Sequence, residues 1–121
     1  MKFPREVNSI VWSQDDSILF IADSSGKINL FDGQVLESML DQPLAELSGA
    51  HTSRCECIAV HPNNQSFVSG GQDSMIVFWD MYELMSSGSV STNDYQVRKL
   101  AYSAKGDYLA AIFFDEIKKK W

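Results

Sequence analysis

Three side chains of this 121-residue chain are of the types that catalyse hydrolysis. His51, Ser69 and Asp73 could supply a base, a nucleophile and an orienting carboxylate, because these groups can come in any order along a chain. The local sequence argues against this chemistry, since Ser69 lies in Phe-Val-Ser-Gly-Gly (67–71) and lacks the Gly-x-Ser-x-Gly elbow of a nucleophile. We therefore expect a hydrogen-bonded structural arrangement, with no catalytic residue and no enzymatic activity.

Two cysteines lie between two histidines in the pattern His51-x3-Cys55-x-Cys57-x3-His61. Thiolates and imidazoles are zinc ligands. The cysteines fall, however, in an apolar run that predicts a strand, where both sulfurs would face one side and the histidines would lie roughly 30 Å apart. Two cysteines are also too few for a disulfide framework. We expect buried free thiols, no metal site and no cofactor.

The distribution of charge and of apolar residues narrows the classes of partner. The chain has 10 basic and 16 acidic residues, of which residues 1–96 hold 4 and 13. Strong direct binding of nucleic acid is not expected, because it depends on clustered Lys and Arg. The longest apolar run, residues 108–114, is far shorter than the roughly 20 residues of a membrane span. The first residues also lack the apolar stretch of a secretory signal, so a soluble intracellular chain without membrane contact is predicted.

An internal repeat organises the chain. Each copy has an apolar run, a polar turn and a second apolar run. In the first two copies a tight turn and a third apolar run follow, and all three copies align without gaps. The three copies begin at residues 7–12, 55–60 and 97–102. Short apolar runs bounded by Gly, Asn, Asp, Ser and Pro predict strands joined by hairpins. Further strands are predicted near residues 44–47 and 88–91, and a weak helical turn over residues 33–40.

The repeat starts are 48 and 42 residues apart, which matches the blades of a β-propeller rather than a helical array. The middle strands of a blade bury both faces, which explains why strict alternation is blurred in residues 55–60, where Cys55, Cys57, Ile58 and Val60 are all apolar. We predict an all-β fold, a partial propeller of about two and a half four-stranded antiparallel blades. Within one region, 1–121, the predicted blades cover about 7–48, about 55–91 and, incompletely, about 97–121.

The second copy resembles the WD40 repeat, because Gly49-Ala50-His51 is followed by Asp73 and then by Trp79-Asp80. This resemblance implies a structural hydrogen-bond network formed by His51, Ser69, Asp73 and Trp79. In it, Asp73 would accept the imidazole N–H, and Ser69 would bridge the imidazole and the indole. The first copy has Phe3, Ile21, Ser25 and Phe31 at these positions, and the third has Asn93, Ala111, Asp115 and Trp121. No such network is therefore expected in the first copy.

A narrower resemblance, over residues 3–112, is to the WD40 subunits of THO/TREX assemblies. It is carried by Glu6-Val7-Asn8, Ala50-His51, Cys55-x-Cys57-Ile58, Trp79-Asp80-x-x-Glu83-Leu84 and Val97-Arg98-x-Leu100. It implies a nuclear scaffold in mRNA processing and export that contacts other protein subunits. The alternative is a WD40 adaptor of another complex, either a ubiquitin-ligase substrate receptor or a chromatin-complex subunit. Arg54, which occupies a repeated position with Glu6 and Gln96, is the candidate partner contact.

The third copy departs from the pattern at its end. Lys118, Lys119 and Lys120 align with residues 76–78 of the second copy, and consecutive lysines cannot line a strand that is buried on both faces. We expect residues after about Phe114 to be frayed or to fit the blade poorly. The end of the chain at the tryptophan is consistent with a truncated product, an alternative reading past an exon boundary or a fragment. Uncovered blade faces and strand edges also predict self-association or aggregation.

Overall fold

The computed structural model describes residues 7–32, 45–47, 51–92 and 95–115, and all of its regular elements there are β-strands. The prediction of an all-β fold is confirmed. No helix in these described ranges has the length and apolar character to cross a membrane. The predicted helical turn at 33–40 and the chain end at 116–121 lie outside the described residues.

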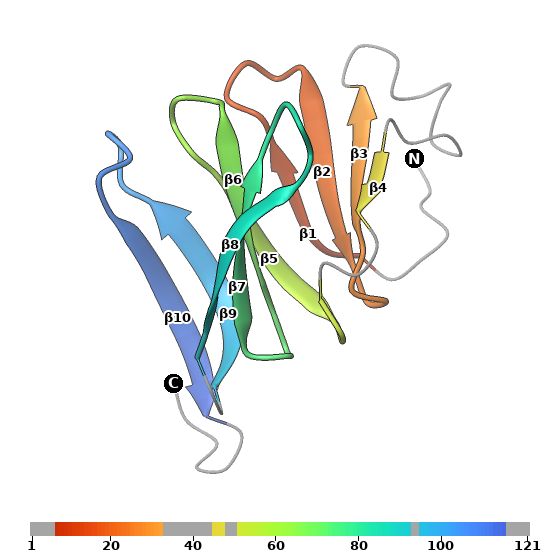
Figure 1. Cartoon of the computed structure of the whole chain (residues 1–121), viewed down its shortest axis with the longest axis vertical. Coiled ribbons are helices and arrows are strands. Elements are labelled where there is room, and N and C mark those ends of the chain that lie inside the picture. Colours follow the sequence, from red (N-terminus) through yellow and green to blue (C-terminus); the bar gives the residue numbers. More distant parts are fainter. Residues whose placement is uncertain (1–6, 33–44, 48–50, 93–94, 116–121) are drawn as a thin grey trace.

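Three antiparallel sheets follow one another along the chain and lie side by side (Figure 1). The first sheet is β1 (Val7–Trp12), β2 (Ile18–Asp23), β3 (Ile28–Asp32) and β4 (Ala45–Leu47), in that order. The second is β5 (Cys55–Val60), β6 (Ser66–Gly71), β7 (Met75–Asp80) and β8 (Ser86–Ser91). The third pairs β9 (Tyr95–Tyr102) with β10 (Leu109–Asp115). Each four-stranded sheet is a simple meander, because every strand pairs with the next one in sequence.

The first turn has the same backbone geometry in all three sheets. Its left-handed residues are Asp16, Asn64 and Gly106, with φ of 62°, 61° and 81°. Asp, Asn and Gly are the residues that tolerate this conformation best. In each case the left-handed residue's N–H donates to the carbonyl three residues earlier, at 2.9–3.0 Å. The internal repeat thus extends to individual backbone hydrogen bonds.

A β-bulge also recurs in the first strand of each sheet. The register shifts between Val7 and Ser9, between Cys55 and Cys57, and opposite the Ile112/Phe113 step on β10. A bulge adds one unpaired residue and resets the alternation of side chains between the faces. This is why the expectation that both sulfurs face one side is wrong. Cys55 packs in the apolar cluster with the first sheet, whereas Cys57 packs in the cluster with the third.

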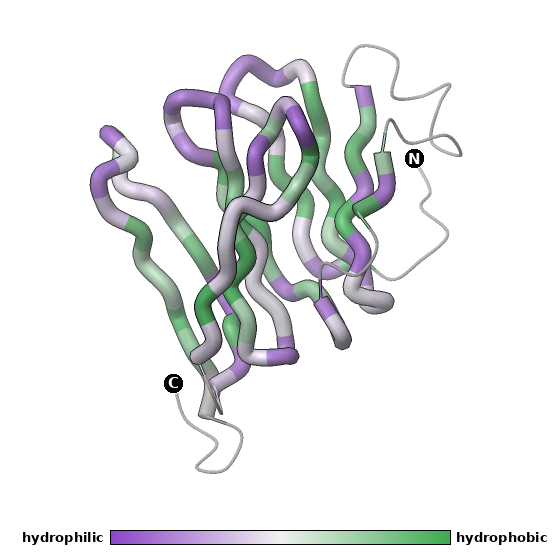
Figure 2. Tube along the Cα trace, in the orientation of Figure 1, coloured by the Kyte–Doolittle hydropathy of each residue, from purple (hydrophilic) through white to green (hydrophobic). Residues whose placement is uncertain are grey.

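Aromatic side chains fill the space between the first and second sheets. The Phe20 and Phe67 ring centroids are 4.7 Å apart, and Phe67 stacks on Trp79 at 5.9 Å. All three rings are at least 93% buried, and burying such a side chain contributes about 1.5–3 kcal/mol. Apolar stretches accordingly follow the central strands, while polar residues gather in the turns (Figure 2).

The second and third sheets meet closely because a glycine lies at their contact. A Cβ on Gly70 of β6 would lie 2.4 Å from the Val97 side chain of β9, so any larger residue would force the sheets apart. At the rim of the same contact, His61 Nε2 lies 3.1 Å from the Gly106 carbonyl oxygen and donates to it. The His61 ring also meets the Tyr102 ring edge-on at 4.8 Å.

Candidate functional site

The structure brings His51, Ser69, Asp73 and Trp79 together in a line that runs from the β6–β7 turn into the middle of the second sheet. His51 precedes β5, Ser69 lies in β6, Asp73 lies in the β6–β7 turn and Trp79 lies in β7. The hairpin connections bring these segments together although the residues span 28 positions. The side chains of His51 and Ser69 are almost completely buried, with residue exposures of 4% and 0%.

The four side chains form a continuous chain of hydrogen bonds. His51 Nδ1 lies 2.9 Å from Asp73 Oδ1, and His51 Nε2 lies 2.8 Å from Ser69 Oγ. The Trp79 indole N–H donates to Ser69 Oγ at 3.0 Å. With the Nδ1–H donating to the carboxylate, Nε2 accepts from the Ser69 hydroxyl. The imidazole nitrogens of His51, the Ser69 hydroxyl and the Trp79 indole N–H then all have partners, as burial requires.

Asp73 also binds the backbone on both sides of it. Its carboxylate accepts from the Thr52 N–H at 3.0 Å and from the Met75 N–H at 3.3 Å. It therefore connects the loop before β5 to the turn before β7. Gly71 leaves the room for this arrangement, since a Cβ there would lie 2.7 Å from His51 Nδ1.

The order Asp73, His51, Ser69 is also the order of groups in a hydrolytic triad. A nucleophile must, however, reach its substrate, and Ser69 is 0% exposed. Its oxygen is further occupied by the indole N–H of Trp79. The arrangement has the atoms of a triad without access for a substrate.

The cysteines are buried free thiols on opposite faces of β5. Burial raises the pKa of Cys57 to about 12 and raises the pKa of Cys55 further above its usual value. The protonated thiol is a poor metal ligand. Among the described residues no three His, Cys, Asp or Glu side chains gather where they could hold a metal ion.

Arg54 lies between the first and second sheets, at the level of the bulge. Its Nε donates to Asn8 Oδ1 at 2.9 Å, and the Asn8 amide donates in turn to the Cys55 carbonyl oxygen at 3.0 Å. Glu56 Oε1 lies 3.7 Å from the same Nε. About a third of the Arg54 side chain stays exposed. Of the two residues at equivalent positions, Gln96 accepts from Arg98 at 2.7 Å, and Glu6 lies outside the described ranges.

Sequence reasoning missed a buried polar cluster in the first sheet. Asp23, at the end of β2, is 0% exposed and accepts from the Ser25 N–H, the Ser25 hydroxyl, the Lys27 N–H and the Asn29 amide at 2.6–3.2 Å. Burial alone would raise the pKa of Asp23, but the hydrogen bonds from Ser25, Asn29 and Lys27 outweigh it and hold that pKa below its ordinary value. The available signal was an Asp that opens a Gly-containing turn, with Asn six residues later.

Comparison with known proteins shows which fold this architecture matches. Residues 41–80 match the family model of the WD domain, G-beta repeat. The crystal structure of RRP9 WD40 repeats superposes on 99% of this chain and 38% of that chain, with a TM-score of 0.79 at 17% identity. The fold is that of a partial WD40 β-propeller. The prediction of fold class is thereby confirmed, and the WD40 repeat family is supported.

Three relatives illustrate the range of WD40 proteins that are similar. THO complex subunit 3 of Arabidopsis thaliana is 30% identical over 110 residues, 91% of this chain and 33% of the relative. Protein NEDD1 of Homo sapiens is 27% identical over 108 residues, 89% of this chain and 16% of the relative. Nuclear distribution protein PAC1 of Candida dubliniensis is 46% identical over 48 residues, 40% and 10% of the two chains. The chain therefore spans a third or less of these relatives.

Proposed function

We propose that this chain is part of a non-enzymatic WD40 scaffold of the THO/TREX type, which acts in mRNA processing and nuclear mRNA export through protein–protein contacts. The observation that supports the scaffold function is the complete burial of Ser69. Its hydroxyl cannot reach a substrate, and its hydrogen bond to His51 is part of a structural network. The similarity to THO complex subunit 3, over 91% of this chain, supports the choice of assembly and a nuclear location.

In this proposal His51, Ser69, Asp73 and Trp79 are a structural network. They hold the loop before β5 against the β6–β7 turn, so that the blade presents rigid loops to its partners. We also propose that the three sheets belong to blades of one region, with bounds of about 7–48, about 55–91 and, for the incomplete third blade, about 97–121. Exposed faces of the outer two sheets, with Ile10 58% and Ile112 49% exposed, would make the chain self-associate or aggregate unless further blades cover them.

The proposed partners are protein subunits of the THO/TREX assembly. The exposed part of Arg54 is the proposed contact, because Arg is a frequent anchor in protein interfaces. No strong direct contact with nucleic acid and none with a membrane is proposed, since the first 96 residues are strongly acidic.

Ester hydrolysis tests the non-enzymatic part of this proposal. In Ser69→Ala the Trp79 indole and the His51 imidazole lose their shared partner, which should cost about 1–3 kcal/mol of stability. The turnover of an activated ester should not change, because there is no activity to lose. Turnover by the parent chain that Ser69→Ala abolishes without unfolding would contradict the proposal.

The second candidate is a WD40 adaptor of a different complex, such as a ubiquitin-ligase substrate receptor or a chromatin-complex subunit. The local similarity to PAC1, 46% over 48 residues, and the longer one to NEDD1 keep this candidate open. Affinity purification of the tagged chain from nuclei separates the two. Stoichiometric THO subunits support the first function, whereas a ligase core or a chromatin complex in their place would overturn it.

A further inference from the structure

The second sheet ends in an edge strand that the rest of the described chain leaves uncovered. All six residues of β8 are exposed, and β8 pairs only with β7 in the sheet order. An uncovered edge presents backbone N–H and C=O groups that another strand can pair with. Natural edges are often protected by Lys or Pro, and the sequence of β8, Ser-Ser-Gly-Ser-Val-Ser, contains neither.

The pairing register identifies the backbone groups of β8 that face outward. The Thr92 N–H donates to the Ser74 carbonyl at 2.8 Å, and the register continues from there with Val90 opposite Ile76. Backbone polar groups of successive residues in an antiparallel strand point to opposite sides. Val90 therefore bonds toward β7, and the N–H and C=O of Ser89 point away from the sheet.

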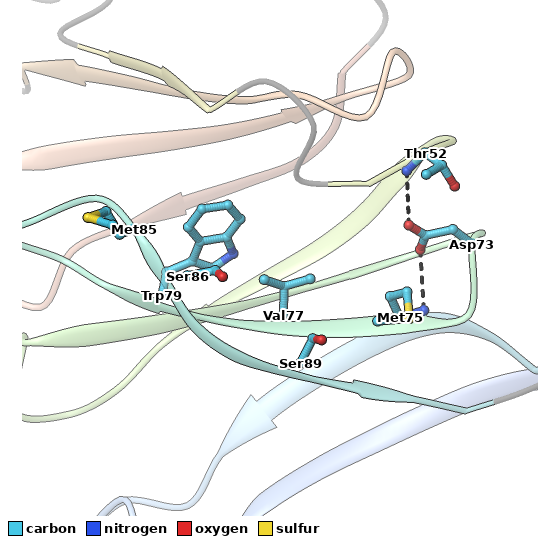
Figure 3. Close-up of a pocket in the computed structure, with 8 residues that line it drawn as sticks. All are labelled: Thr52, Asp73, Met75, Val77, Trp79, Met85, Ser86 and Ser89. Carbon is cyan, nitrogen blue, oxygen red and sulfur yellow. Dashed lines mark hydrogen bonds between the residues drawn. The ribbon is translucent and has the colours of Figure 1, made fainter.

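A cavity of about 520 Å³ lies beside this edge, on the face of β7 and β8 that is turned away from the third sheet (Figure 3). It is lined by Thr52, Asp73, Met75, Val77, Trp79, Met85, Ser86 and Ser89. Its walls are thus mainly methionine, valine and the indole, with one carboxylate at one end. Methionines suit such a surface because they adapt to different apolar side chains.

The charge of the second sheet selects the kind of peptide that would bind. Residues 55–91 contain Glu56, Asp73, Asp80 and Glu83 but neither Lys nor Arg. Of the eight residues that line the cavity, one is acidic and none is basic. Complementary charge guides association and excludes acidic partners.

We propose that the outer edge of β8 and the adjoining cavity, together called the β8 groove, bind an extended basic segment of a partner protein. The segment adds a strand to β8, and its alternate aliphatic side chains pack along the face that Met75, Val77 and Met85 line. A strand beside β8 presents alternate side chains to the face that Ser89 and Val77 share, so backbone pairing and cavity filling occur together. This inference rests on the proposed scaffold function and gives it a partner chemistry.

The test uses the full 121-residue chain and a fluorescent nine-residue peptide that alternates leucine or valine with lysine or threonine. Two versions carry N-methyl groups on alternate amides, so that each blocks one edge of the peptide strand. Fluorescence anisotropy should show saturable binding that one version loses by about tenfold or more and the other retains. Equal loss from both versions, equal retention by both, or no saturable binding would overturn the inference.

Two lysine substitutions beside β8 locate the groove. Met85→Lys, at a position 63% exposed in the groove, should weaken peptide binding about tenfold. Tyr82→Lys is the matched control, because Tyr82 is 76% exposed in the same β7–β8 turn as Met85 and is not among the residues that line the cavity. Its effect should be about twofold or less. Similar effects of the two variants would overturn the assignment.

Three further outcomes separate this inference from its rivals. Dimerisation that Ser89→Pro abolishes in sedimentation would show that a second copy of the chain occupies the edge and would overturn peptide binding there. Recovery of THO subunits that Met85→Lys leaves unchanged would reject the groove and retain the scaffold. Peptide binding by the chain, without THO subunits in the purification, would support the β8 groove and reject the THO/TREX assignment.

Discussion

The first and second sheets have the same strand order, turns and bulge, yet they satisfy their buried polar groups differently. In the first sheet Asp23 accepts from Ser25, Lys27 and Asn29, which lie two to six positions ahead of it. In the second, Asp73 binds His51, which lies 22 positions away. In both blades the buried polar groups at the tight turn have hydrogen-bond partners, but different residues supply those partners in each blade. In the second sheet the Asp73 carboxylate also attaches the preceding loop, because it accepts from the Thr52 N–H.

The largest expected effect comes from the aromatic residues at equivalent positions, Trp79 and Phe31. Trp79→Ala and Phe31→Ala should each cost about 3–5 kcal/mol of unfolding free energy, because each empties a site less than 8% exposed. Trp79→Ala should cost about 1–3 kcal/mol more, since it also removes the partner of the Ser69 hydroxyl. Denaturant unfolding measures both. Equal costs would mean that the indole hydrogen bond adds no stability.

The next effect distinguishes the local carboxylate from the long-range one. Asp23→Ala and Asp73→Ala should each cost about 1.5–3 kcal/mol, because each removes several hydrogen bonds to a charged group. Amide hydrogen exchange should differ between the two variants. Asp73→Ala should speed exchange most at Thr52, in the distant loop, whereas Asp23→Ala should speed it most within its own turn, at Ser25 and Lys27. Faster exchange at Thr52 in both variants would remove the distinction.

Acid should weaken the first sheet through Asp23. Because its folded-state pKa is lowered, the stability it contributes is complete above the ordinary value of 3.8 and is lost as the pH falls below that value. The free energy of unfolding, measured from about pH 5 to about pH 2, should fall less steeply for Asp23→Asn than for the parent chain. Asp15 also contributes to the acid dependence, because hydrogen bonds from Ser17 and Ser13 lower the pKa of Asp15 to about 2. Asp15→Asn, measured in parallel, separates its contribution from that of Asp23. An unchanged slope in Asp23→Asn would contradict the assignment.

The smallest effect concerns Ser25, which occupies the position equivalent to Asp73. Its hydroxyl donates to Asp23 at 2.6 Å from an exposed site, so Ser25→Ala should cost about 0.5–1.5 kcal/mol. Combined with Ser69→Ala, the two costs should add within about 0.5 kcal/mol, since the Ser25 hydroxyl bonds Asp23 whereas the Ser69 hydroxyl bonds His51 and Trp79. Marked non-additivity in thermal unfolding would show that the two clusters are coupled.

The repeat made much of this architecture predictable, because it records the same turn three times. Residues such as Asn64 and Gly106 announce left-handed turn positions, and the apolar runs between them correspond to strands. The fourth strands were also visible, although β4 is only three residues long. These features depend on residues that are close together in the sequence, so they can be predicted from the sequence alone.

Features that depend on register or on other segments were less legible. The bulge between Cys55 and Cys57 reverses the face of one sulfur, and no residue type there signals it. The Asp23 cluster was missed because motif alignment places Asp23 opposite Gly71, where the second sheet has no side chain. The β8 groove depends on which backbone groups of Ser89 point outward, and that follows only from pairing.

Because of the bulge in β5, each junction between sheets contains one cysteine whose reactivity reports the opening of that junction. Cys55 is sealed at the junction of the first and second sheets and Cys57 at that of the second and third. Because the thiolate is the reactive species and burial disfavours it, an alkylating reagent reacts only after a junction has opened. The order in which the two sulfurs are labelled therefore records which blade detaches first.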